Sequence, residues 1–464
     1  LTAAIINLTG LPNSHLALKV GTALFGLVAI PFTFLLGSLL YGRLVGLAAA
    51  FLLAISHWHV AITRVGLRFP FTAAFATPVL YFFLRALAHN RRNDWLLAGL
   101  FLGIGLHTYT AMRVLPLISA VLLALTLIHD GMRRLRKAQL RVGDSWTRGF
   151  WLNSLLFLVF VLLLLTPLLR YMTDDPASVW IRSTSRAIPE TPQTTAVIAE
   201  QFLRNVYNAA LMFNVRGDVV AMNTIPYEPV LGLVTGALFI LGLAYLLWRL
   251  LVNRDPRSLL LLIILFFLLL PSILSLAYPG ENPSVVRTGG APPAVMIIAA
   301  VPFVAIPTRM SASGSSAAKA AARLMVIALS LIAIVYNANW YFHDYDENIL
   351  YSIGNATELG AVLADFEAQG ATVANAYHIP YPHWIDTRAI GINAGHVRWD
   401  NAVEVEDLPA HVYGARPRLY LVNKDDAEAL AALQQMFPDG SIERYDSSRF
   451  GRDFFIFRVP EKSV

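Results

Sequence analysis

Residues 258–277 read SLLLLIILFFLLLPSILSLA, a run of twenty residues that carries no charge. A helix of that length covers about 30 Å, which is the thickness of the hydrocarbon layer of a membrane. Pro271 is compatible with a helix there, because neighbouring helices in a membrane protein satisfy the carbonyl group that a proline frees. The stretch therefore predicts a transmembrane helix.

Nine further apolar runs predict about ten transmembrane helices in the first 340 residues. These runs are 16–40, 44–62, 70–88, 94–111, 112–129, 150–169, 228–250, 291–307 and 323–341. Composition agrees, because 56% of the chain is hydrophobic and 14% is charged, whereas soluble domains average about 45–50% apolar and about 25% charged residues. A soluble enzyme and a disordered chain are excluded, and the lack of cysteine excludes disulfides and thiolate sites.

The distribution of charge predicts the orientation of the helices. If the first run leads toward the cytoplasm, alternate short loops hold sixteen basic residues and the opposite loops hold nine. The richer set should be cytoplasmic, because Lys and Arg accumulate in cytoplasmic loops. The long loop 170–227, the loop 278–290 and the acidic residues 341–464 then lie outside. Basic residues so placed indicate membrane orientation, and no nucleic-acid partner is expected.

Residues 195–213, within the long loop, predict an amphipathic helix. Its apolar residues recur at helical spacing: Ile198, Phe202, Val206, Ala209 and Phe213. We expect this helix to lie on the membrane surface. The alternative is a helix that packs on the outer part of the protein itself.

Residues 341–464 predict a soluble α/β domain, separate from the transmembrane domain 1–340. A helix is expected from Asn355 to Gly370, with Glu358 completing a capping box. A second helix is expected at 425–436. Strands are expected at 372–376, 418–422, 442–445 and 454–459.

Polar residues of this domain are better explained as surface than as a site. His378, His383 and Asp386 are conceivable metal ligands, but histidines in loops near aromatic residues are usually surface groups. Four arginines could bind an anion or a sugar, and a solvated face is the favoured interpretation for them: Arg388, Arg398, Arg416 and Arg418.

The outer end of the second predicted helix carries the most polar cluster, SHWHVAITRVGLR at 56–68. Ionisable side chains at membrane depth are costly and are functional candidates for that reason. Arg64, with His59 close by, offers guanidinium fork geometry to a phosphate. The alternative is an aromatic belt with arginines that reach the lipid head groups, which we favour for Arg68.

A second outer cluster, HTYTAMR at 107–113, lies in a tight turn between two predicted helices. In a compact bundle its Tyr109 and Arg113 would face the same outer cavity as Arg64. Convergence of these groups on one pocket that opens sideways to lipid is the geometric expectation.

The third cluster is the glycine- and proline-rich loop YPGENPSVVRTGG at 278–290. Glu281 and Arg287 are candidate substrate-binding residues there. A turn held together by an internal Glu–Arg pair is the alternative. The chain has no phosphate-binding loop, dinucleotide fingerprint, HExxH or GxSxG motif, so nucleotide hydrolysis and zinc proteolysis have no support.

Three stretches resemble glycosyltransferase family 39, the bacterial branch related to protein O-mannosyltransferases and lipid A aminoarabinose transferases. They are residues 18–68, LFLGIGLHTYTAMRVLPL at 100–117 and ENPSVVRTGGAPPAVMIIAA at 281–300. The resemblance covers roughly residues 1–340 and implies a GT-C bundle. It also implies a polyprenyl-phosphate sugar as donor and transfer with inversion, outside the membrane, to a lipid, glycan or protein.

By the same resemblance, Arg64 belongs at the donor phosphate or its cavity wall, and Arg287 matches a recurrent arginine of the late outer loop. A phosphate leaving group needs cations around it, and a hydroxyl acceptor needs a carboxylate base. The family's acidic base lies in the first outer loop, and this sequence resembles the part that follows it. The catalytic base is therefore expected upstream of Leu1.

That departure motivates an alternative, a non-catalytic GT-C-derived subunit that acts as scaffold in a larger membrane complex. A third hypothesis is a lipid or solute transporter, but the chain has fewer intramembrane charges than we expect of a transporter. The leading expectation is a multi-pass enzyme of the bacterial cytoplasmic membrane with its C-terminal domain outside. Its partners are the donor, membrane lipids and the acceptor. No cofactor is expected, and a divalent cation is left open.

Overall fold

The computed structural model describes residues 7–8, 10, 15–135, 147–188, 193–312, 314–350, 354–382, 384–411 and 417–461. The chain forms two compact units. The membrane unit is Thr22–Tyr345, and the second unit is Asp346–Val464 together with Leu1–Gly21. His383, Arg416 and the predicted basic loop residues 136–141 lie outside the described residues.

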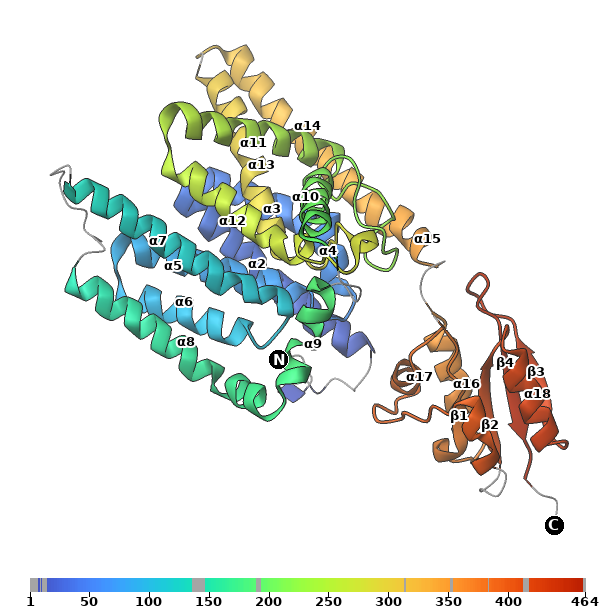
Figure 1. Ribbon diagram of the computed structural model, residues 1–464. Helices are drawn as coiled ribbons and strands as arrows, with labels where there is room; N and C mark the ends of the chain where they lie inside the picture. Colours follow the sequence, from blue (N-terminus) through green and yellow to red (C-terminus); the bar gives the residue numbers. More distant parts are fainter. Residues whose placement is uncertain are drawn as a thin grey trace. The chain divides into compact units, whose positions relative to one another are not determined.

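Long helices joined by turns make up the membrane unit (Figure 1). In chain order, beginning with the helix that leads into this unit, they are α2 (His15–Tyr41), α3 (Arg43–Ile55), α4 (His57–Arg64), α5 (Pro70–His89), α6 (Arg92–Gly105), α7 (Val114–Leu135), α8 (Arg148–Asp174), α9 (Pro176–Ala187), α10 (Thr195–Leu211), α11 (Leu233–Asn253), α12 (Pro256–Ile273), α13 (Pro292–Ser311) and α14 (Ser316–Asn339). A π-helical turn (Trp340–Asp344) leads from α14 to the short α15 (Tyr345–Leu350).

Eight helices among the described residues are long and apolar enough to cross a membrane. A ninth crossing results if α3 and α4, which meet at a bend of 54°, form one span. Ten crossings were predicted, and the one that the structure lacks is α6. Its 14 residues extend only about 21 Å at 1.5 Å per residue, which is too short to cross a membrane. The run 94–111 misled because it continues through a turn into the 3₁₀ helix η1 (Thr110–Arg113).

Small residues allow the central helices to pack closely. The largely buried α13 lies against α3, α11 and α14. A Cβ atom at Gly242 of α11 would collide with the carbonyl group of Ile298, and one at Gly46 of α3 would collide with that of Phe34. Glycine at such contacts is expected in a membrane, where close van der Waals packing takes over from the hydrophobic effect. By contrast, α8 buries little of its surface and packs mainly on α6, as suits a helix with one side toward lipid.

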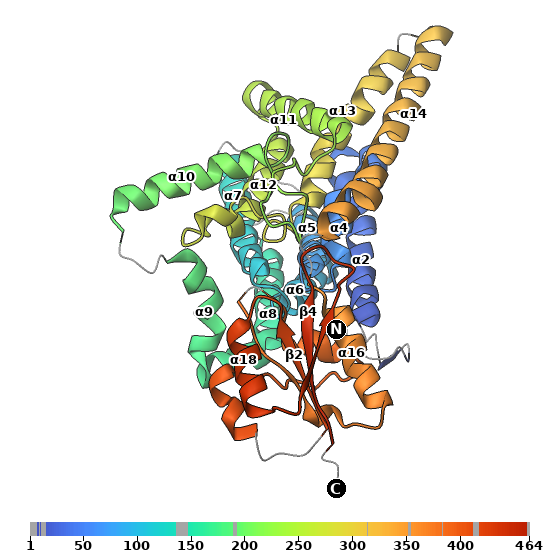
Figure 2. The same cartoon turned by 90° about the vertical axis from the view of Figure 1, so that its right-hand side faces the viewer.

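The amphipathic helix predicted at 195–213 is present as α10, which extends out of the bundle in Figure 2. Its C-terminal half packs on α12, where the fully buried Asn205 donates a hydrogen bond of 2.8 Å to the carbonyl oxygen of Ile273. Leu203 and Tyr207 are more than 60% exposed on another face. The helix therefore packs on the protein by one side, and contact of its exposed apolar face with lipid stays a prediction.

The second unit contains a four-stranded sheet with the order β1-β2-β4-β3. Its strands are β1 (Ala376–His378), β2 (Arg418–Asn423), β3 (Ser441–Tyr445) and β4 (Phe454–Val459); its helices include α16 (Ala356–Ala368), α17 (Thr387–Asn393) and α18 (Ala427–Met436). β1 and β2 are parallel and the other pairs are antiparallel. Alternate β2 residues serve two cores, since Leu419 packs with Leu363 of α16 and Tyr420 packs with Leu433 of α18.

Four expectations for this unit were wrong. His378, which was expected at the surface, is fully buried in strand β1. Residues 373–375 form a 3₁₀ turn, so the first strand starts at Ala376. Glu358 does not close a capping box, because its carboxylate binds Ser447 and Ser448. Arg418 is buried rather than solvated, with its guanidinium 5.3 Å from the ring centroid of Phe437.

Candidate functional site

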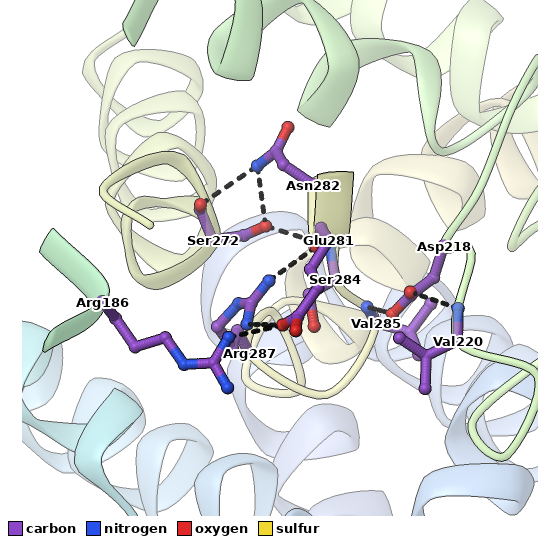
Figure 3. A network of polar contacts seen from close by, with 9 residues as sticks. All are labelled: Arg186, Asp218, Val220, Ser272, Glu281, Asn282, Ser284, Val285 and Arg287. Carbon is purple, nitrogen blue, oxygen red and sulfur yellow. Dashed lines mark hydrogen bonds and ion pairs between the residues drawn. The ribbon is translucent and has the colours of Figure 1, made fainter. Parts of the chain in front are cut away.

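The loop between α12 and α13 holds a compact ionic network (Figure 3). Glu281, at the end of the 3₁₀ turn η2 (Pro279–Glu281), accepts from two arginines through one carboxylate oxygen. Arg186 of α9 approaches Oε2 at 2.6 Å and Arg287 approaches it at 3.1 Å. Arg287 also donates to the backbone carbonyl oxygen of Glu281 at 2.6 Å. The three side chains together carry one net positive charge.

Buried polar contacts fix the backbone of this loop. Asn282 donates through Nδ2 to the carbonyl oxygen of Ser272, at the end of α12. The hydroxyl of Ser272 accepts from the backbone N–H of Ser284 at 3.0 Å. On the other side Asp218, which is fully buried, accepts from the backbone N–H of Val285 at 2.8 Å. Figure 3 shows these anchors on both sides of the Glu281–Arg287 pair.

The two carboxylates of this region have opposite electrostatic surroundings. Burial alone would raise the pKa of Glu281, but hydrogen bonds and charge from Arg287 and Arg186 outweigh it, so the pKa is lowered. Burial dominates at Asp218 and raises its pKa, although three backbone N–H groups and Arg287 act in the other direction. Glu281 is therefore an ionised partner of the arginines, and Asp218 is an internal anchor.

One donor atom of Arg287 is buried without an acceptor in the described part of the chain. Its side chain is 14% exposed, and its Nη atoms bind Glu281. Its Nε is buried and has no hydrogen-bond acceptor among the described residues. A buried polar group without a partner is costly and uncommon. This Nε atom is the donor atom of Arg287 that the described residues leave buried without an acceptor.

Helix α9 links the second outer cluster to this network. Arg113 donates at 3.0 Å to the carbonyl oxygen of Val179, near the start of α9, and lies 4.9 Å from the ring centroid of Trp180. Arg186 lies at the other end of α9, and its guanidinium stacks on Tyr278 at 4.1 Å. Helix α9 thus contacts Arg113 near its start and carries Arg186, a partner of Glu281, at its other end.

Tyr109 contacts the aromatic side of the outer turns. Its ring lies 5.5 Å from that of Phe69, and Arg68 stacks on it at 5.6 Å. The carbonyl of Phe69 in turn closely faces Gly289 of the late loop. Phe69 therefore links Tyr109 to that loop.

Arg64 and His59, both on α4, have partners outside the ionic network. Arg64 is exposed at the end of α4, and its guanidinium stands 5.1 Å from the ring centroid of Tyr341. His59 is buried, with Nε2 3.1 Å from the carbonyl oxygen of Gly26. His59 faces the helix packing because the bend at Ser56 turns that side of α4 toward α2, so we leave it out of the site.

Two important residues escaped the sequence interpretation. Arg186 was one of several arginines in a long loop, and Asp218 belonged to no motif. Their partners are 95 and 67 residues away in the chain. Asp218 could have been predicted only from its burial, because a buried carboxylate needs hydrogen-bond donors. Burial of a residue in a loop, however, produces no periodic pattern in the sequence.

Among the described residues, no group of three His, Asp or Glu side chains is arranged to hold a metal ion. The buried His378 instead pairs with Thr387, its Nδ1 lying 2.8 Å from the hydroxyl oxygen. Arg388 is paired with Asp400 at 2.9 Å.

Comparisons with known proteins fit this architecture. Residues 1–171 match the family model of dolichyl-phosphate-mannose-protein mannosyltransferases. Solved structures of ArnT from Cupriavidus metallidurans are similar over 95% of this chain. The apo form has a TM-score of 0.55 at 14% identity over 83% of its length. The form bound to undecaprenyl phosphate has a TM-score of 0.54 at 13% identity over 84% of its length. No curated protein matches.

The chain is a multi-pass membrane protein with the fold of the GT-C superfamily. Its first 171 residues are similar to the dolichyl-phosphate-mannose-protein mannosyltransferases.

Proposed function

We propose that this protein is a membrane glycosyltransferase that takes a sugar from a polyprenyl-phosphate donor. The fold and the match over residues 1–171 support this class. One observation carries the proposal: the buried, unused Nε of Arg287 beside a second arginine, Arg186, in an anchored loop. A phosphate oxygen is the acceptor that guanidinium groups bind best.

The arrangement suits departure of a phosphate. When the bond between the sugar and the phosphate breaks, negative charge accumulates on the phosphate oxygens. Arg287 is already oriented by Glu281, and its loop is held by Asp218 and Asn282, so little reorganisation accompanies the reaction. Preorganised donors of this kind stabilise a developing anion most effectively.

The carboxylates of the loop are not proposed as the base that deprotonates the acceptor. Glu281 is engaged by two arginines, and Asp218 accepts two backbone hydrogen bonds at 2.8 and 2.9 Å. We propose transfer by a single inverting displacement to a lipid, glycan or protein acceptor. The positive-inside pattern supports a site and C-terminal unit on the outer side of a bacterial cytoplasmic membrane. The reaction is proposed to need no cofactor, with a divalent cation left open.

Transfer from a radiolabelled polyprenyl-phosphate sugar by purified full-length protein tests this function. Arg287→Gln removes the charge and the fork, and loss of one such donor lowers kcat by about a hundredfold or more. Arg204→Gln is the control, because Arg204 is an exposed arginine on α10 paired with Glu200. Equal transfer by Arg287→Gln and the control would overturn the assignment. Donor binding by an inactive wild-type protein would support the scaffold alternative.

A further inference from the structure

A cavity lined by both charged and apolar residues lies at the opposite ends of the helices that carry the site. It encloses about 530 Å³ between the end of α2, the start of α3, the end of α11, the start of α12 and the end of α13. Since α12 and α13 each run between this region and the loop at 279–291, the cavity and the site are separated by the length of a transmembrane helix. The positive-inside pattern makes this end the cytoplasmic one.

Arginines dominate the charged lining of this cavity. Arg43, Arg249, Arg257 and Arg309 line it, and Asp255 is its only acidic lining residue. Four arginines and one aspartate give three net positive charges. Such an excess in a pocket between membrane helices attracts an anion.

Asp255 is already engaged by the protein. It pairs with Arg249 at 3.1 Å and accepts from the hydroxyl of Ser258 at 3.2 Å. It also caps α12 by accepting from the backbone N–H of Arg257. Little of its charge is left for the other arginines.

Two of the arginines are uncommitted. Arg43 and Arg309 are both exposed, and neither has an ion pair or hydrogen bond within the described part of the chain. Arg249 adds a buried Nε that lacks an acceptor there. Spare guanidinium donors thus converge from α3, α11 and α13 on one cavity.

We propose that this cavity binds the phosphate group of an anionic phospholipid from the cytoplasmic leaflet. Guanidinium forks match phosphate oxygens in charge and geometry. The walls favour a lipid over free phosphate, because apolar side chains such as Val304 and Leu44 line the cavity beside the arginines. Leu44, at the N-terminal start of α3, is 65% exposed. An acyl chain would lie against it. Retention of such a lipid anchors α3, α11 and α13 to one another at this end.

Lipid retention by delipidated full-length protein, read by native mass spectrometry, tests the proposal. Wild-type protein is expected to retain phosphatidylglycerol in preference to phosphatidylcholine. Arg43→Gln/Arg309→Gln removes two charges, each worth about a factor of five in binding to an anionic surface, so retention should weaken by about twenty-five-fold. Arg43→Lys/Arg309→Lys should recover most of it. Neither exposed arginine supports the fold, and an unchanged gel-filtration profile checks this.

Arg91→Gln/Arg92→Gln is the matched control, because it removes two basic residues from the turn before α6, at the same end of the bundle and outside the cavity. This control should retain the lipid, and so should Arg287→Gln, which separates the cavity from the proposed donor site. Equal retention by Arg43→Gln/Arg309→Gln and the control would overturn the proposal. Displacement of bound lipid by millimolar inorganic phosphate, with phosphate then retained, would overturn its assignment to a lipid.

Discussion

Arg287 holds Glu281 at two points, through the carboxylate at 3.1 Å and through the backbone carbonyl oxygen at 2.6 Å. The side chain and the main chain of Glu281 therefore fix the plane of the same guanidinium group. The N–H group at Nε of Arg287 lies inside the protein without an acceptor among the described residues. This geometry unites the two interpretations of the loop, because the Glu–Arg pair that structures the turn also orients a donor for substrate.

Glu281→Gln should loosen the loop at 279–291. The substitution removes the ion pairs to both arginines, and partly exposed pairs contribute about 1 kcal/mol. Hydrogen exchange of peptides from this loop should then become about fivefold faster at neutral pH. Glu200→Gln, which breaks the exposed pair with Arg204, should leave these peptides unchanged.

The Glu281 effect should also depend on pH. Because the pKa of Glu281 in the folded protein is below its ordinary value of 4.5, its stabilisation is complete above that value. It is lost as the pH falls through the lowered folded pKa. Wild type and Glu281→Gln should therefore converge in loop protection at acid pH. A difference that persists undiminished there would contradict this origin.

Asp218→Asn should weaken the anchoring of the same loop from the opposite side. The carboxylate accepts from Val285 and Val220, whereas an amide has only one acceptor oxygen and would leave one buried N–H unsatisfied. The cost is about 1–3 kcal/mol. The thermal transition of the full-length protein in detergent should shift down, and Asp174→Asn at an exposed helix end should not shift it. Equal stability of the two variants would refute the anchoring role.

His378 should make the second unit sensitive to acid. Burial lowers the pKa of His378 from 6.5 to about 4, although the charge of Asp386 opposes this. The unfolded chain binds the proton first, so stability is complete above pH 6.5 and falls by about 1.4 kcal/mol per pH unit down to about pH 4. Urea titrations of full-length protein, with deuterium pulses read at residues 418–423, should show this slope. His378→Gln should remove it, and an unchanged slope would contradict the assignment.

Long apolar runs predicted most of the membrane helices, the exception being the run 94–111. A run such as 258–277 has no stable alternative to a helix in lipid, since every backbone polar group must be satisfied internally. The ends of helices were less predictable. The helix α14 begins at Ser316, seven residues before the apolar run at 323, because the alanine-rich segment there favours a helix without being strongly apolar.

The candidate site was predicted only where its residues are close in sequence. Glu281 and Arg287 are six positions apart, and their pairing was one of two interpretations of the loop. The surroundings of Arg64 were not predicted, because its partner Tyr341 comes from a helix end that is distant in the sequence. Arg186 and Asp218 reach the loop through tertiary packing of α9 and of the segment before α11, and helical or strand periodicity does not encode such contacts.

Binding of a polyprenyl phosphate to purified full-length protein tests the central claim most directly. Arg287→Gln should weaken this binding by about tenfold or more, since a charged hydrogen bond to phosphate contributes about 1.5–3 kcal/mol. Arg204→Gln should bind as the wild type does. Equal affinity of Arg287→Gln and wild type for the lipid phosphate would contradict the account.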